Sequence, residues 1–225
     1  MLTALAENLW TLDRPLRVMG LEMGTRMSIV RLASGGLFVH SPVSLDAALG
    51  DALAALGPVE IVAAPCLFHH LSIAEWARAY PEAAIVGCPG LAKKRNDVTW
   101  TGTGTLGDSP EPQWAGELDQ VFFGAYSLEN EVVFFHRASR TILSSDLIFN
   151  LSTVRSGLTR FVAKVIGNRQ PGPTVIERVA IRDRSAARAQ IDRMIAWDAE
   201  RIVLAHGDIV AANGAAVLTN AYRWL

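Results

Sequence analysis

The residues of this chain with the clearest potential for chemistry are histidines and one aspartate that follow short apolar segments. Five histidines are present, and four of them follow such segments. Segments rich in Val, Ile and Phe are typical of β-strands, and binding and catalytic side chains gather where the loops at strand ends converge. The polar residues at the segment ends are His40, the pair His69 and His70, Asp146 and His206.

Imidazoles and a carboxylate in these positions indicate a metal site. Imidazole nitrogen and carboxylate oxygen are ligands of Zn, Fe and Mn, and such a metal activates water or polarises an ester or phosphoryl oxygen. We therefore expect His69, His70, Asp146 and His206 to hold one divalent metal, with Asp146 as the catalytic carboxylate.

Three further residues are auxiliary candidates for the same site, namely His40, Glu129 and Cys66. His40 ends its own apolar segment, and Glu129 comes shortly before the segment 131–136. A thiolate is a good zinc ligand, so Cys66 could contribute to the site. A single cysteine after an apolar strand is more often simply buried, and we favour that interpretation of Cys66.

The same residues also allow an interpretation without a metal. Adjacent side chains of an extended segment point in opposite directions, so only one of His69 and His70 would face a site. Asp146 could cap a turn or a helix. The histidines would then be hydrogen-bonded to one another, to Asp146 and to water, because buried polar groups need partners whether or not they do chemistry.

A predicted hairpin indicates which residues lie near Asp146 and which lie far from it. Residues 131–136 and 141–145 are apolar and are separated by a short polar turn. In an antiparallel pair the start of one strand lies beside the end of the other. We therefore expect Glu131, or Glu129 just before it, to lie near Asp146, and His136 to lie at the opposite end of the hairpin.

The elements that must position these residues alternate between strands and helices. Expected strands are residues 27–32, 37–40, 59–64, 84–86, 121–123, 131–136, 141–145 and 201–205, and expected helices are residues 45–56, 71–80 and 212–225 and segments within 156–166 and 185–197. Two sheets packed face to face with helices outside would bury these strands. We predict one α+β domain over residues 1–225, with the Gly- and Pro-rich loop 99–116 as a lid or binding loop.

The composition of the chain limits the classes of partner that we expect it to bind. Its 225 residues are 50% hydrophobic and carry a net charge of -1. A protein that coats nucleic acid needs an excess of Lys and Arg, so we do not expect this function. The apolar runs are far shorter than the roughly 20 residues of a membrane span, and the first residues lack the basic region of a secretion signal. Two cysteines are too few for a disulfide framework. We expect a cytoplasmic protein whose partner is a small-molecule substrate or ligand, with no nucleic acid or membrane; the oligomeric state is left open.

Taken together, these segments resemble the metallo-β-lactamase fold, in a branch with a degenerate set of metal ligands. The segments that carry the resemblance are MSIVRLASGGLFVHSP, PCLFHHLSIAEWARAYP, PGLAKKRND, EVVFFHRASRTILSSDLIFN and AHGDIV. The resemblance extends from about Leu9 to Trp224. It implies a four-layer αββα sandwich.

The resemblance also implies a reduced site. Catalytic members carry His-x-His-x-Asp-His after the first buried strand, whereas this chain has PCLFHH at 65–70. The first two ligand histidines align near Cys66 and Phe68, and the Asp-His pair aligns with His69 and His70. The usual Gly-His-Thr turn reads Gly-Ala-Tyr at 124–126.

Of the remaining positions of the family's site, some are matched in this chain and one is replaced. Asp146 matches the bridging Asp, and His206 matches the last ligand. His40 replaces the Asp that usually ends the early hairpin. Two-metal hydrolysis needs about six ligands, so we expect at most a single metal here.

Two functions follow from this resemblance. The first is a metal-dependent hydrolase of a small ester, lactone or phosphodiester that uses a single-metal site. The second is a non-catalytic protein of the same fold that binds a ligand or a partner without metal.

Overall fold

The computed structural model describes residues 1–125, 130–151, 154, 156–166, 168 and 170–225. Strands β1 (Thr3–Ala6), β2 (Leu9–Arg14), β5 (Thr25–Arg31), β6 (Leu37–His40), β7 (Val59–Ala64) and β8 (Ala84–Gly87) form a six-stranded sheet in the order β1-β2-β5-β6-β7-β8. Strands β9 (Leu118–Phe123), β10 (Glu131–His136), β11 (Thr141–Leu143) and β12 (Arg201–Val203) form a four-stranded sheet in the order β12-β11-β10-β9.

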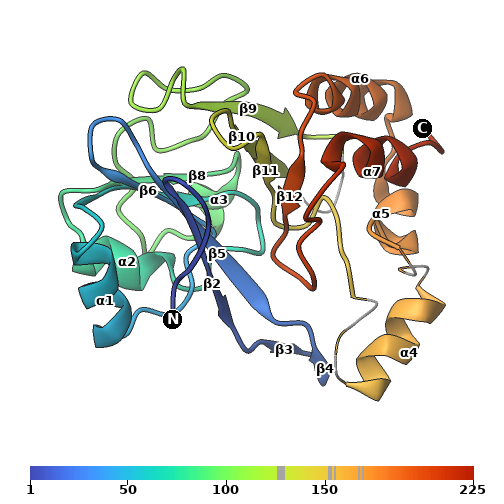
Figure 1. Cartoon of the computed structure of the whole chain (residues 1–225), viewed down its shortest axis with the longest axis horizontal. Coiled ribbons are helices and arrows are strands. Elements are labelled where there is room, and N and C mark those ends of the chain that lie inside the picture. Colours follow the sequence, from blue (N-terminus) through green and yellow to red (C-terminus); the bar gives the residue numbers. More distant parts are fainter. Residues whose placement is uncertain (126–129, 152–153, 155, 167, 169) are drawn as a thin grey trace.

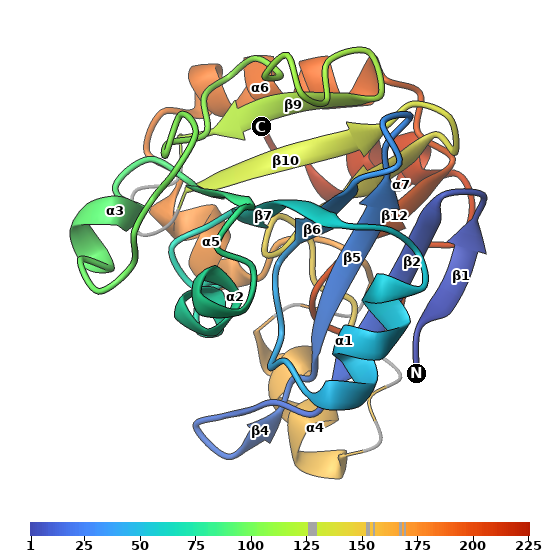
Figure 2. The ribbon, with the colours of Figure 1, turned by 90° about the vertical axis from the view of Figure 1, so that its left-hand side faces the viewer.

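Helices cover the outer side of each sheet. The helices of the first half of the chain are α1 (Ala47–Ala54), α2 (Ile73–Ala79) and α3 (Leu91–Lys94). Those of the second half are α4 (Gly157–Val165), which lies apart from the sheets, α5 (Val175–Ala180), α6 (Arg184–Ile195) and α7 (Gly214–Ala221). Figure 1 shows α1 and α2 on one side of the paired sheets and α6 and α7 on the other, and Figure 2 looks onto α1 and α2 from their own side. The layers are therefore helices, sheet, sheet and helices.

The alternation of side chains along β10 explains why the four-stranded sheet is apolar on both faces. Val132 and Phe134 belong to the core that lies between the two sheets. Val133 and Phe135 belong to a second core beneath α6 and α7. A strand covered on both faces has no solvent side, and this accounts for the uninterrupted apolar run before His136.

The structure differs from the sequence-based expectation in several elements. The pairs β1–β2 and β3 (Arg17–Val18)–β4 (Leu21–Glu22) and the short helices α3 and α5 were not predicted. The loop 99–116 contains no named helix or strand, and its Trp114 is buried in the core between the sheets. This loop does not line the cavity described below, so it is not a lid over that cavity, and its role as a binding loop stays a prediction.

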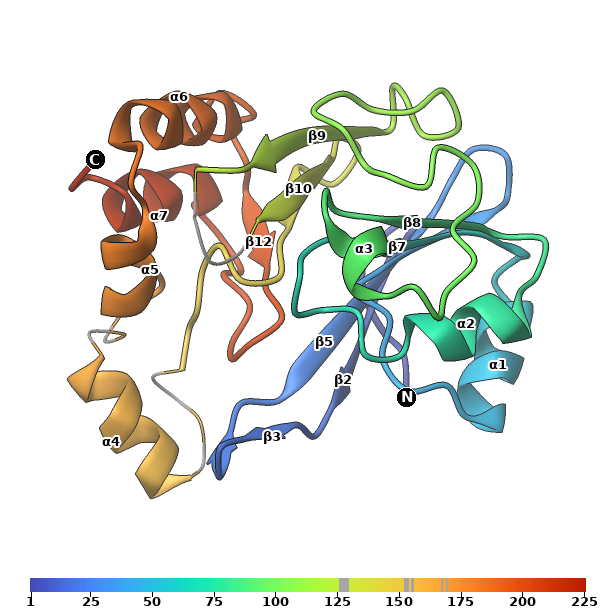
Figure 3. The ribbon, with the colours of Figure 1, turned by 180° about the vertical axis from the view of Figure 1, so that it is seen from behind.

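Two short elements stand apart from the layers. The β3–β4 hairpin and α4 project together at one end of the molecule, as Figures 1 and 3 show from opposite sides. The backbone N–H of Glu22 donates to Thr159 Oγ1 at 2.9 Å and joins them. Within the described part of the chain, no helix has the length and apolar composition needed to cross a membrane.

The inter-sheet core yields a first prediction. Phe38 on β6 contacts Trp114 and Phe134 edge to face, with ring centroids 5.3 and 5.1 Å apart. We expect Phe38→Ala to lower the free energy of unfolding by about 3–5 kcal/mol, because it leaves a cavity between the sheets.

The control is Phe161→Ala, which truncates a side chain that is 65% exposed. Its effect in chemical denaturation should stay within about 0.5 kcal/mol. Equal effects of the two variants would contradict this assignment of the core.

Candidate metal centre

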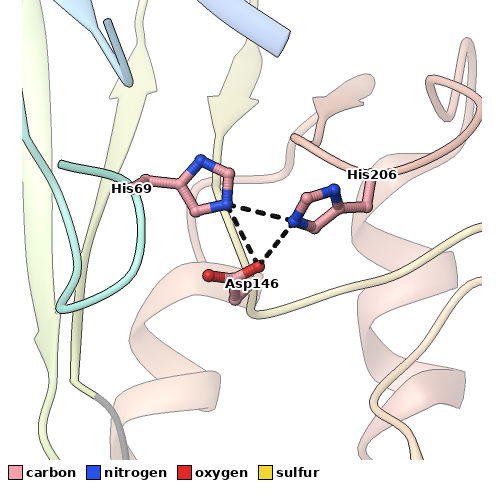
Figure 4. Close-up of side chains that lie close together, drawn as sticks. All are labelled: His69, Asp146 and His206. Atoms are coloured by element: carbon pink, nitrogen blue, oxygen red, sulfur yellow. Dashed lines mark hydrogen bonds and ion pairs between the residues drawn. The ribbon is translucent and has the colours of Figure 1, made fainter. Parts of the chain in front are cut away.

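Three loops bring two imidazoles and one carboxylate to a common point. His69 comes from the loop after β7, Asp146 from the segment after β11, and His206 from the segment after β12. Their side chains point toward one another in Figure 4. The Nε2 atoms of His69 and His206 are 3.1 Å apart, and Asp146 Oδ1 lies 3.4 Å from the first and 3.3 Å from the second.

The orientation of His206 is set by Gly24, the residue that precedes β5. Its Nδ1 lies 2.7 Å from the carbonyl oxygen of Gly24, so Nδ1 carries the proton and donates to that oxygen. Nε2 therefore presents its lone pair to the site, as a metal-binding imidazole requires. The ring also stacks on Phe149, with centroids 5.6 Å apart.

The backbone that carries His206 is tied to the six-stranded sheet by one arginine. Arg26 on β5 donates from Nη1 to the carbonyl oxygens of Leu204 and Gly207, at 2.6 and 2.9 Å. Gly207 has a φ of 90°, and a Cβ at this position would lie 1.9 Å from the Asn150 carbonyl oxygen. The Ala-His-Gly sequence thus reflects a close approach of two backbones beside the site.

His69 and Asp146 are linked by Cys66. The Cys66 thiol donates to Asp146 Oδ2 at 3.3 Å, and its sulfur accepts from the backbone N–H of Phe68 and of His69. The side chain is fully buried. Cys66 therefore shapes the loop that presents His69 and engages the Asp146 oxygen that faces away from the two imidazoles.

Glu131 holds the backbone of the Asp146 segment. Its buried carboxylate accepts from the backbone N–H groups of Ser145, Asp146 and Leu147, at 2.6, 2.9 and 2.7 Å. Burial, together with the nearby Asp146 carboxylate, raises the pKa of Glu131. The expected proximity of Glu131 to Asp146 is confirmed.

The three converging atoms fit a metal ion. Ligands placed about 2.0–2.2 Å from a tetrahedral Zn²⁺ lie about 3.3–3.6 Å from one another, close to the separations seen here. Burial lowers the pKa of His69, but the charge and hydrogen bonding of Asp146 outweigh it and raise that pKa overall. A positive charge is thus favoured here. Three protein ligands leave one position for water or substrate, the arrangement of catalytic rather than structural zinc sites.

The structure places His70 away from this centre. Arg95 Nη1 donates to His70 Nδ1 at 3.0 Å and to the His70 carbonyl oxygen at 2.7 Å. Burial, with the nearby charges of Lys94 and Arg95, lowers the pKa of His70. The neighbours His69 and His70 point to different partners, and the expectation that His70 is a fourth ligand is replaced by a role in bracing the loop.

The remaining histidines are also not part of the three-residue group. His40 is fully buried and does not belong to the three-residue group; burial, with a contribution from His69, lowers its pKa to about 3. Within the described chain its Nε2 has no hydrogen-bond partner. Glu129 lies outside the described residues. His136 lies at the far end of β10, where Nδ1 is 2.7 Å from Ser139 Oγ, as the hairpin geometry predicted.

A cavity of about 930 Å³ opens onto the three residues. Its walls come from the β3–β4 hairpin and from the loop after β7, and they are mainly apolar, with Val18, Met19, Leu21, Phe68 and Phe149 among them. Sequence reasoning did not identify this hairpin as a wall. The pairs Met19-Gly20 and Met23-Gly24 in RVMGLEMG were the available signal for tight turns.

Comparisons with known proteins give one family and one fold. A family model described as "Domain of unknown function (DUF4336)" matches residues 6–165. None of the curated proteins compared with the chain matches it.

Solved structures of metallo-β-lactamases superpose on the whole chain. DIM-1 metallo-β-lactamase exposed to ceftazidime has a TM-score of 0.68 at 14% identity, covering 100% of this chain and 96% of its own. A metallo-β-lactamase from Erythrobacter litoralis has 0.68 at 12%, with coverages of 100% and 96%. FIM-1 from Pseudomonas aeruginosa, in a mono-zinc form, has 0.65 at 11%, with coverages of 100% and 95%. The expected metallo-β-lactamase fold is confirmed.

The geometry of the centre predicts metal-dependent stability. Zn²⁺ added to metal-free protein should stabilise the fold by about 2.7 kcal/mol at 100 times its dissociation constant. Calorimetry should show this shift in the wild type and in His70→Gln, and lose it in His206→Ala. An equal shift in His206→Ala would show that the metal binds elsewhere.

A second prediction concerns Glu131. Glu131→Gln keeps its size but replaces one carboxylate oxygen by an amide N–H₂, which cannot accept from the backbone. We expect metal affinity, measured by competition with a chelator, to fall about 10–100-fold, the usual cost of losing a group that orients a ligand. Unchanged affinity would mean that the Asp146 segment holds its place without this carboxylate.

Proposed function

The chain belongs to the family described as Domain of unknown function (DUF4336), and from its metallo-β-lactamase fold and the cluster of His69, Asp146 and His206 we propose that it is a single-metal hydrolase. The observation that carries this proposal is the convergence of three donor atoms, from buried side chains that line a large cavity. Their separations suit one metal ion with an open position.

Some residues of this site would bind the metal, and others position those ligands. His69 Nε2, His206 Nε2 and Asp146 Oδ1 would hold the ion. A divalent Zn, Fe or Mn ion bound there supplies a Lewis acid that polarises an ester or phosphoryl oxygen and lowers the pKa of water. The Cys66 thiol engages the second oxygen of Asp146, and Glu131 holds its backbone, so the carboxylate keeps one orientation toward the ion.

The cavity indicates the class of substrate within this proposal. Its walls are mainly apolar, and they also include Lys94 and two arginines, of which Arg14 pairs with Asp46 and Arg17 with Glu22. Lys94 Nζ lies 5.1 Å from the centroid of the Phe68 ring, at the same wall. These features suit an ester or lactone with an apolar portion, or a phosphodiester whose charge meets the basic side chains.

A non-catalytic binding protein is the competing proposal. Cys66 and Phe68 occupy the positions where catalytic relatives of this fold are expected to carry ligand histidines. On this view the same cavity would bind a ligand, and His69, Asp146 and His206 would be a hydrogen-bonded remnant. Metal content and activity, measured together, distinguish the two.

The test is hydrolysis of p-nitrophenyl esters of increasing chain length, of lactones and of bis-p-nitrophenyl phosphate by protein loaded with Zn²⁺, Fe²⁺ or Mn²⁺. Asp146→Asn should reduce kcat/KM at least about 100-fold, because it removes charge at the metal. His136→Gln, at the far end of the hairpin, should retain activity.

Two outcomes would count against the hydrolase. One is stoichiometric metal without turnover of any substrate class, which would favour the binding protein. The other is equal activity in the wild type and in Asp146→Asn, which would place the chemistry outside this centre.

A further inference from the structure

Helix α4 exposes three of its large apolar residues and buries two smaller ones. Leu158, Phe161 and Val165 are 59%, 65% and 67% exposed, whereas Thr159 and Ala163 are 1% and 2% exposed. A helix on the surface of a globular protein normally turns its apolar stripe inward. The spacing i, i+3, i+7 places the three exposed side chains on one stripe, which nothing in the described chain covers.

The tip of the β3–β4 hairpin adds apolar surface at the same end of the molecule. Met19 is 97% exposed and Val18 is 46% exposed. Met19 has a φ of 49° and Gly20 a φ of 83°, a two-residue turn whose first position favours Asn, Asp or Gly. A methionine is thus held at a backbone conformation that costs it energy, with its side chain in solvent.

The two elements form one surface. Glu22 on β4 and Thr159 on α4 are hydrogen-bonded, and Figures 1, 2 and 3 all show α4 beside β4 at the same end of the molecule. We call this surface the tip face and define it by Val18, Met19, Leu158, Phe161 and Val165. Val18 and Met19 also line the cavity, so the tip face adjoins the entrance to the metal centre.

Charge favours an anionic partner for the tip face. Helix α4 carries Arg160 and Lys164 and no acidic residue, although the net charge of the chain is -1. Both basic residues are exposed and lie four positions apart on the helix. A second copy of the chain docked on the same face would bring these like charges together, which opposes self-association.

We propose that the tip face binds the surface of an anionic lipid bilayer. A basic helix with an exposed apolar stripe lies in the plane of a bilayer, its apolar side chains below the headgroups and its Lys and Arg beside the phosphates. Such binding needs no spanning segment, so the absence of a spanning sequence does not oppose it. The sequence-based expectation of no membrane partner was drawn from the absence of a spanning segment, and this proposal departs from it.

Because the tip face adjoins the entrance to the cavity, lipid binding would bring that entrance to the bilayer surface. An apolar ester or lactone partitions into bilayers, and a cavity whose entrance rests on the bilayer receives such a substrate without its passage through water. This link rests on the proposed hydrolase, whereas lipid binding itself does not depend on catalysis.

Sedimentation with vesicles tests the proposal without substrate. The probe is vesicles of phosphatidylcholine and phosphatidylglycerol in equal amounts, compared with pure phosphatidylcholine. The full chain should sediment with the mixed vesicles, and added salt should weaken binding. The pair Leu158→Ser and Phe161→Ser should reduce the partition coefficient at least about tenfold.

Charge reversal separates the tip face from general attraction to the vesicles. Each basic residue at an anionic surface contributes about fivefold to binding, so Arg160→Glu with Lys164→Glu should lose at least about 25-fold. The matched control is Lys93→Glu with Arg223→Glu, which changes the net charge equally on α3 and after α7 and should change binding much less. Circular dichroism would verify that each variant is folded.

Several outcomes would overturn the proposal. They are failure of the wild type to sediment, equal loss in both charge-reversed variants, and a dimer in light scattering that Leu158→Ser with Phe161→Ser dissociates. The last would assign the tip face to a second copy. Failure of the hydrolase assays with intact vesicle binding would discard the enzyme and keep the lipid surface.

Discussion

Two imidazole nitrogens that face each other at 3.1 Å, with a carboxylate oxygen equally near both, are the constraint on which this structure depends. Two lone pairs cannot occupy that geometry without a proton or a cation between them. The carboxylate favours either one, since it stabilises positive charge in a buried site. Much of the structure around the centre, including the Gly24 carbonyl, the Cys66 thiol and the Glu131 carboxylate, serves to hold these three donors in place.

The layered fold could be predicted from sequence because its signals are local. The apolar strand runs, the hairpin turn before Thr141 and the helix stops each depend on a few neighbouring residues. Asp146 and His206 followed from their strand ends, and the antiparallel register of β10 and β11 placed Glu131 beside Asp146 and His136 far from it.

Other features of the site could not be predicted, because they arise from contacts between distant segments. The choice between His69 and His70 depends on Arg95, which lies 25 positions from His70 and engages its ring. The tautomer of His206 depends on Gly24, which is 182 positions away. The wall made by the β3–β4 hairpin depends on two very short strands that have no periodic pattern. Helix α4 was expected within 156–166, but its inverted burial follows from the small residues that fit against the rest of the molecule.

The donors of the centre come from both sheets, and this has a mechanical consequence. His69 follows a strand of the six-stranded sheet, whereas Asp146 and His206 follow strands of the four-stranded sheet. Hydrogen bonds from Arg26 on β5 to Leu204, and between His206 and Gly24 just before β5, connect the two sheets at this edge. A relative slide of about 1 Å would pull the nitrogens out of reach of a shared ion, since such sites tolerate errors of that size poorly. An ion bound here would link the two halves of the chain. The fraction of molecules that hold the ion would therefore report how firmly the two sheets pack against each other.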